Sequence, residues 1–235
     1  FGLLWFVISP LLLFLIYMFV FSEIMNIRFQ GRDASLDFDY SYILFSGLVI
    51  HFFMSEIITA APVVILENPN YVKKVRFPLE ILPLIKVLSS ILPMLTGYLI
   101  LVVALMVFKN LFSPQIVLVL LVLIPYVILN IGIALFLASS GVFFRDISQF
   151  SGMISTVLLF GSPVLFPLER LPETLQAIVW FNPITVPVIV SRDIIFWNHY
   201  DTLHLLVPYT LFAIVIFWLG SFWFMNSKRG FADVM

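Results

Sequence analysis

Cysteine is absent from this 235-residue chain, and charged residues make up only 11% of it. Without cysteine the chain forms no disulfide, holds no cysteine-ligated iron–sulfur cluster and performs no thiol catalysis, although this absence says nothing about its compartment. A soluble domain is about 25% charged and about 45–50% apolar, whereas this chain is 62% hydrophobic. The composition therefore excludes a soluble globular protein, a disordered chain and a nucleic-acid-binding protein.

Sequence motifs for catalysis and cofactor binding are also missing. None of the five lysines follows a glycine, so the chain lacks the GxxxxGK[ST] loop with which many ATPases bind nucleotide. It also lacks the HExxH and GxSxG motifs and any histidine-rich cluster, and we expect His199 and His204 at a membrane interface rather than on a metal. The sequence thus predicts no catalytic residue, no metal site and no cofactor in this chain.

Long hydrophobic stretches dominate the sequence. A helix that spans a bilayer takes about 20 apolar residues, and the chain has six such stretches, at about 2–22, 40–66, 83–108, 115–139, 150–168 and 203–226. They predict an all-α integral membrane protein, with six transmembrane helices in a single transmembrane domain over 1–235. The chain begins at Phe1 rather than at methionine, so we expect further residues before it.

The lysines and arginines of the connections indicate the orientation, because cytoplasmic loops are enriched in these residues. With six spans, one set of connections carries seven of them, counted with Lys86 near the end of its span, and the other carries five together with eight acids. The densest basic group lies in the short loop at 67–82, on the seven-cation side. We therefore expect that side, and both termini, in the cytoplasm.

The connection at 67–82, which we call the basic loop, has the sequence ENPNYVKKVRFPLEIL. Asn68-Pro69-Asn70 is a turn and helix-start signal, and a short helix with two different faces is expected to follow. Its apolar face holds Tyr71, Val72 and Val75, and its basic face holds Lys73, Lys74 and Arg76. Such a helix either lies flat on the membrane as an interfacial anchor or inserts into a cytoplasmic partner.

Arg145 and Asp146 follow two phenylalanines in the short connection at 140–149, on the same expected side. Opposite charges at the start of a helix pair with other loops or with a partner. The alternative is a solvated cap, in which Asp146 lies at the positive end of the helix dipole.

Residues 169–202 form a long connection that is rich in proline yet half apolar. Five of the fourteen prolines fall between 161 and 187, so no continuous helix crosses this stretch. We expect two short re-entrant or interfacial helices on the outer side, at about 171–181 and 184–196, with Asn182-Pro183 as the corner. They form either a gate over a pathway, built with Pro163, Pro167, Trp180, Asn182 and Pro183, or a structural cap anchored by Trp180 and Trp197.

Aromatic side chains form stripes on the first two spans. At 100° per residue, one face of the first span holds Phe14, Tyr17 and Phe21, and one face of the second holds Tyr42, Phe45, Phe53 and Glu56, with Phe52 at its edge. Tyrosine hydroxyls and a carboxylate disfavour contact with lipid. These residues are candidates for lining a channel whose aromatic planes stack on sugar rings. The alternative is simple packing, since the chain has 26 phenylalanines.

Glu56 is the one acid well inside an expected span. A charge there costs about 2.5–3.5 kcal/mol on insertion scales. Its carboxylate therefore faces protein, water or a partner, is protonated, or lies close to the cytoplasmic interface.

Several segments, in the same order, resemble the membrane subunits of ABC-2 type exporters, specifically the Wzm-like branch that exports O-antigen and other polysaccharides. The first span, FGLLWFVISPLLLFLIYMFVF, resembles the Gly-x-x-Trp…Pro first span of that family, and ENPNYVKKVRFPLEILPL resembles its coupling helix. FFRDI resembles the loop before its fifth span, and SPVLFPLERLPETLQAIVWFNPIT resembles its outer re-entrant region. The resemblance covers nearly the whole chain.

The resemblance implies a permease of the cytoplasmic (inner) membrane that works as a homodimer with two separate cytoplasmic ABC ATPase subunits, which bind ATP and magnesium. It further implies export of a glycan carried on a polyprenyl diphosphate lipid, as in O-antigen export and lipopolysaccharide biosynthesis. Near alternatives are exporters of teichoic acid, capsule, drugs or lipids. A different class is an intramembrane transferase acting on lipid-linked sugars, which would need a polar cluster within the spans.

Overall fold

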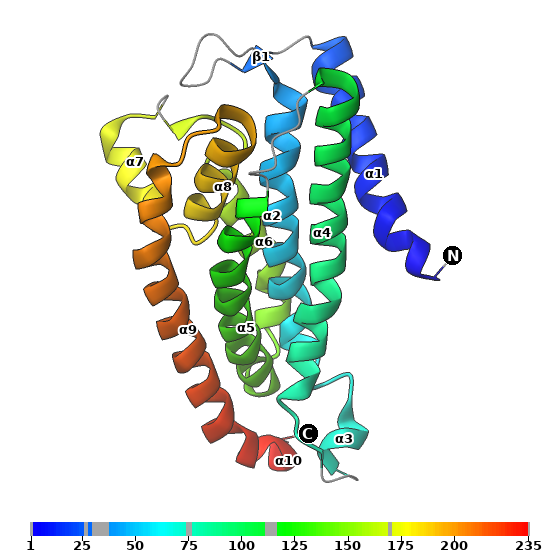
Figure 1. The fold of residues 1–235 in the computed structure, drawn as a ribbon. Helices are drawn as coiled ribbons and strands as arrows, with labels where there is room; N and C mark the ends of the chain where they lie inside the picture. The colour runs from blue at the N-terminus through cyan, green and yellow to red at the C-terminus, as the bar shows by residue number, and fades with distance from the viewer. Residues whose placement is uncertain are drawn as a thin grey trace. The chain divides into compact units, whose positions relative to one another are not determined.

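The computed structural model describes residues 2–25, 28–29, 38–73, 77–110, 117–168 and 171–234. Its longer helices are α1 (Trp5–Tyr17), α2 (Tyr40–Ala60), α4 (Ile81–Lys109), α5 (Val119–Phe143), α6 (Ile147–Phe160) and α9 (Leu206–Ser227) (Figure 1). The shorter ones are α3 (Pro69–Lys73), α7 (Glu173–Trp180), α8 (Thr185–Arg192) and α10 (Phe231–Val234). Two short strands, β1 (Arg28–Phe29) and β2 (Phe38–Asp39), pair antiparallel before α2.

The described part of the chain contains five helices that are long and apolar enough to cross a membrane. With their helical extensions they cover Trp5–Ile24, Tyr40–Val63, Ile81–Lys109, Val119–Phe143 and Asp201–Gly230. They confirm the all-helical membrane class and match five of the six expected spans. The count becomes six if the bent pair formed by α7 and α8 crosses the membrane as one span.

The expected span at 150–168 is wrong in its extent. Its helix is α6, which has only 14 residues and ends at Phe160. At 1.5 Å per residue such a helix is about 21 Å long, shorter than the roughly 30 Å hydrocarbon core. Pro163 explains the early end, because the residue before a proline is driven out of the helical region and the proline itself lacks an N–H.

The structure divides into two compact units, and each is described by itself. Unit 1 comprises Phe1–Phe52, Ile91–Val122 and Leu158–Leu205, and unit 2 comprises Phe53–Ser90, Leu123–Val157 and Leu206–Met235. The divisions fall inside α2, α4, α5 and α6, so these helices contribute residues to both units. The single transmembrane domain over 1–235 stays a prediction.

Unit 1 is organised around the first half of α2, where every residue from 41 to 50 is buried. Helix α1 is joined to α4 by a hydrogen bond that the Thr96 hydroxyl donates to the Phe6 carbonyl over 2.7 Å. Near the strands, the Lys109 ammonium lies 2.9 Å from the Asp39 carboxylate and 5.9 Å from the centre of the Tyr42 ring. These contacts hold the ends of α2 and α4 together.

Unit 1 also contains the bent pair α7 and α8, which we call the α7–α8 hairpin (the yellow and gold helices of Figure 1). After α8 the chain continues as a wide helical turn over Asp193–Trp197, and the two arms meet at 102°. The two short helices expected at 171–181 and 184–196 are confirmed, as is the break between them at Asn182-Pro183.

Unit 2 is held together by close helix crossings. A Cβ at Gly220 of α9 would lie 2.1 Å from the carbonyl oxygen of Gly132 on α5, so only glycine allows the two backbones to approach this far. One turn further along α9, the Trp223 indole donates a hydrogen bond to the Ser140 hydroxyl of α5 over 3.1 Å. Small residues and an interhelical hydrogen bond thus fix the position of α9 on α5.

Candidate functional site

The basic loop opens as its sequence predicts. Helix α3 begins at Pro69, and the Asn68 carbonyl accepts the N–H of Tyr71 over 3.2 Å. The Tyr71 side chain is 42% exposed, and its ring centre lies 4.7 Å from that of Phe77. The rest of the ATPase contact predicted for the basic loop falls on Lys74, Val75 and Arg76 and on the side chains of Val72 and Lys73, which lie outside the described residues.

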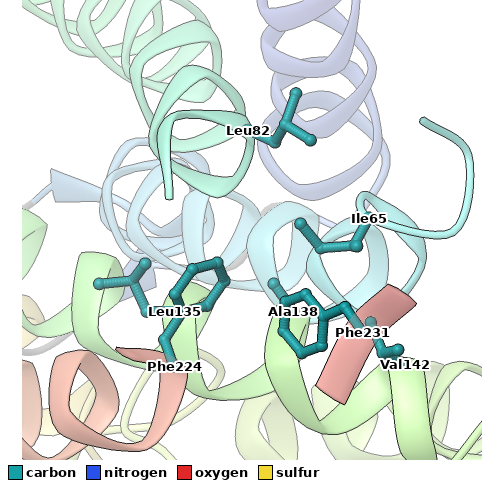
Figure 2. Packing of buried hydrophobic residues seen from close by; sticks show 7 residues of the cluster. All are labelled: Ile65, Leu82, Leu135, Ala138, Val142, Phe224 and Phe231. Carbon is teal, nitrogen blue, oxygen red and sulfur yellow. The ribbon is translucent and has the colours of Figure 1, made fainter. Parts of the chain in front are cut away.

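Both stems of the basic loop are anchored in one cluster of buried hydrophobic side chains in unit 2 (Figure 2). Ile65 precedes the loop and Leu82 closes it. The other members come from α5, α9 and α10, and they are Leu135, Ala138, Val142, Phe224 and Phe231. We call these seven residues the Phe231 cluster. It gives the loop a fixed base on three other helices.

Arg145 and Asp146 are exposed between α5 and α6. Their backbone carbonyls start the turn of α6, since the carbonyl of Arg145 accepts the N–H of Ser148 and that of Asp146 accepts the N–H of Gln149. Both side chains are therefore accessible to a partner. They belong to unit 2, the unit that also carries α3. Their role in ATPase contact stays a prediction.

A buried arginine organises the α7–α8 hairpin. Arg192, at the end of α8, is 5% exposed, and its guanidinium donates hydrogen bonds to three backbone carbonyls. The acceptors are Pro163 at 2.5 Å, Val164 at 2.8 Å and Ile43 at 2.9 Å. A Cβ at Gly47 would lie 2.8 Å from the same guanidinium, so a glycine makes room for it. Arg192 thus joins α8 to the turn after α6 and to the start of α2.

The corner of the hairpin is fixed by Asn182. Its side-chain amide donates a hydrogen bond to the Leu158 carbonyl of α6 over 2.8 Å, and its side-chain oxygen accepts the N–H of Ile184. Trp180, next to the corner, is 41% exposed. Of the predicted gate residues, the structure thus brings Pro163 to Arg192 and Asn182 to α6. Pro167 and Pro183 are partly buried.

The aromatic stripes pack partly against each other. In unit 1 the Phe14 ring centre lies 5.7 Å from that of Tyr42 and 5.0 Å from that of Phe45, and all three side chains are buried. The Tyr17 and Phe21 rings are 6.2 Å apart. These contacts lie inside one chain, and the channel-lining role of the stripes stays a prediction.

The second half of the stripe on α2 belongs to unit 2 and differs in exposure. Phe53 is buried against Tyr126, with ring centres 5.6 Å apart. Phe52, at the boundary in unit 1, is 37% exposed. Phe52, Glu56 and Thr59 recur every three or four residues, and they follow the accessible face of α2.

Glu56 has a partner that the sequence did not reveal. Its carboxylate lies 2.6 Å from the Lys86 ammonium of α4, and both side chains are partly exposed. An ion pair cannot face acyl chains without a large desolvation cost. This face of unit 2 is therefore suited to water or another polar surface rather than to lipid.

Comparison with protein families gives a match to the ABC-2 type transporter model over residues 1–196. The chain belongs to the ABC-2 type transporter family. Two O-antigen export system permease proteins RfbA from Klebsiella pneumoniae are each 25% identical to it, over 100% of this chain and 87% or 88% of theirs. An RfbA permease from Myxococcus xanthus is 23% identical over 99% of this chain and 87% of its own length.

Membership makes this chain a multi-pass permease, the membrane subunit of a transporter. It also confirms the resemblance that the basic loop, FFRDI and the proline-rich connection had indicated. In the described part of this permease, no group of three or more histidine, aspartate or glutamate side chains is placed to hold a metal ion.

The sequence did not indicate the contacts of three residues of this permease: Lys86, Arg192 and Phe231. Lys86 is the one charged residue in the apolar stretch at 83–108, and Arg192 stands beside Asp193 in the largely apolar stretch at 184–196. That signal is available from sequence, because an ionisable residue in a membrane segment needs a partner. Phe231 gave no such signal among 26 phenylalanines.

Proposed function

We propose that this permease exports a lipid-linked, O-antigen-like polysaccharide across the cytoplasmic membrane. Two copies form the channel, and two cytoplasmic ABC ATPase subunits, which bind ATP and magnesium, drive the transport. The observation that carries the substrate class is the match over 99–100% of this chain to permeases named for O-antigen export.

The arrangement of unit 2 supports the ATPase partner. A transporter subunit without a nucleotide-binding loop needs a separate source of energy, and it must present a surface to that source. Exposed Tyr71 on α3 and exposed Arg145 and Asp146 after α5 provide such a surface in one unit. Because both stems of the basic loop are packed in the Phe231 cluster, a displacement of α3 would be transmitted to the helices that carry this cluster.

The accessible face of α2 supports a polar pathway. An aromatic ring at Phe52, the Glu56–Lys86 pair and the Thr59 hydroxyl are all partly or fully exposed along it. Such a face suits a hydrated glycan, which stacks on aromatic rings and binds hydroxyls weakly. Weak contacts at many points let a long chain move, because conduction requires binding weak enough to release.

The orientation is part of the proposal and is tested separately. The Lys and Arg count, made with six crossings, supports the basic loop and both termini in the cytoplasm and the α7–α8 hairpin outside. This topology requires the chain to cross once between α5 and α7, through α6 and the turn after it. Because the chain has no cysteine, single cysteines at 173 and 201 can be probed with an impermeant thiol reagent. Both should react in intact cells and a cysteine at 70 should not. Reaction at 173 only after lysis would overturn this topology.

The function is tested by purifying the permease together with its ATPase and reconstituting the complex in lipid vesicles. A polyprenyl-diphosphate-linked glycan should stimulate ATP hydrolysis and should appear on the far side of the membrane. The lipid carrier alone and a free glycan serve as controls. Stimulation by a drug, a phospholipid or a teichoic acid, with no response to the linked polysaccharide, would refute the proposed substrate class and point to another ABC-2 exporter.

A further inference from the structure

The end of the described chain folds back onto the basic loop. After α9, a short helical turn over Lys228–Gly230 leads into α10, and α10 contacts α3. We call residues 228–234 the C-terminal segment. It therefore contacts the same short helix that carries exposed Tyr71.

Phe231 is the anchor of this segment. The side chain is fully buried, and its ring centre lies 5.7 Å from that of Phe224 and 5.9 Å from that of Phe143. Figure 2 shows the ring beside Ile65 and Ala138. A ring in this position holds the end of α5, the end of α9 and the first stem of the basic loop against one another.

A polar contact ties the same segment to the second stem. The Lys228 ammonium lies 3.5 Å from the Glu80 carboxylate, two residues before Leu82 of the Phe231 cluster. Both side chains are about one-third exposed, so this ion pair alone contributes little. It does show that the C-terminal segment contacts the basic loop at both of its ends.

We propose that Phe231 is the residue that positions α3 for the cytoplasmic ATPase. The inference rests on the proposed function, because it assumes that an ATPase binds α3. Phe231 itself is buried and does not contact the partner. It keeps α3 fixed relative to α5 and α9, so that a displacement imposed by the ATPase moves these helices and is not absorbed by the loop.

The test uses Phe231→Ala in the full permease–ATPase complex. Removal of the ring frees α3, while every residue that faces the ATPase is retained. We expect the glycan exported per ATP hydrolysed to fall between about twofold and thirtyfold, the range in which residues that transmit coupling act. A nitroxide label on a single cysteine at Asn70, an exposed position of α3, should become more mobile.

The matched control is Phe222→Ala. Phe222 is also a phenylalanine near the end of α9, but it is 57% exposed and stacks on Trp218. It should leave both the coupling ratio and the label unchanged. Phe231→Leu retains most of the buried volume and should lose less coupling and less order of the label than Phe231→Ala.

Wild-type label mobility and a wild-type coupling ratio in Phe231→Ala would overturn the inference. If that variant does not accumulate in membranes, Phe231→Val decides, because it also removes the ring, and wild-type label mobility and a wild-type coupling ratio in Phe231→Val would likewise overturn the inference. The label is read in the permease alone as well. A wild-type complex whose ATP hydrolysis is not stimulated by the glycan would count against the proposed function. The label in the permease alone would still measure whether Phe231 positions α3.

Discussion

Arg192→Met should strongly destabilise unit 1, because Arg192 is the buried arginine that joins α8 to the start of α2. The methionine retains the length and much of the volume of the side chain but none of its donors. The substitution removes the hydrogen bonds to Pro163, Val164 and Ile43, and it leaves their carbonyls without the guanidinium.

The size of the effect follows from the three acceptors. The Ile43 carbonyl lies in α2 and also accepts the Ser46 hydroxyl over 2.7 Å, so its loss is small. The carbonyls of Pro163 and Val164 lie in the turn after α6, and each becomes a buried acceptor that has lost a charged donor, at about 1–3 kcal/mol apiece. We therefore expect a loss of about 2–6 kcal/mol in the free energy of unfolding.

The assay is unfolding of the purified permease in detergent, combined with amide hydrogen exchange. Exchange should rise at 164–165 and in α8 and stay unchanged in α3, which belongs to unit 2. Arg145→Met is the matched control, because Arg145 is exposed and its loss should change stability by less than about 0.5 kcal/mol. Arg192→Lys retains the charge and should fall between the two. A stability of Arg192→Met within about 1 kcal/mol of wild type would refute this reasoning.

Three further predictions concern helix contacts and the accessible face of α2. Gly220→Ala should lower the free energy of unfolding by about 1–3 kcal/mol, because its Cβ would lie 2.1 Å from a backbone oxygen of α5. Gly152→Ala is the control: its Cβ would meet no atom within 4 Å, so it should be neutral or stabilising in the same unfolding experiment. Glu56→Lys should destabilise the permease through like-charge repulsion, and adding Lys86→Glu should recover that loss, whereas additive effects in the double-mutant cycle would contradict a direct pair. Phe52→Ala should slow glycan export at unchanged stability, since its ring is partly exposed; normal export in vesicles would leave the aromatic stripe as packing alone.

The sequence by itself determined the membrane class, the positions of five spans and the break at Asn182-Pro183. It also located the start of α3 at Pro69. These features depend on properties of neighbouring residues: the length of an apolar run, the missing N–H of proline and the signals that begin a helix. The resemblance to ABC-2 exporters rested on the same local segments.

Only the tertiary structure decided which residues meet. Arg192 finds an acceptor at Ile43, 149 residues away, and Lys86 finds Glu56 across 30 residues. Phe14 packs on Tyr42 inside the chain. Whether an aromatic stripe packs in this way depends on the neighbouring helix rather than on the spacing of the stripe's own residues. In a membrane the hydrophobic effect hardly favours contact with protein over contact with lipid, because both are apolar. Hydrophobicity therefore predicts that a segment spans, and close packing and rare polar contacts decide which of its faces meets another helix.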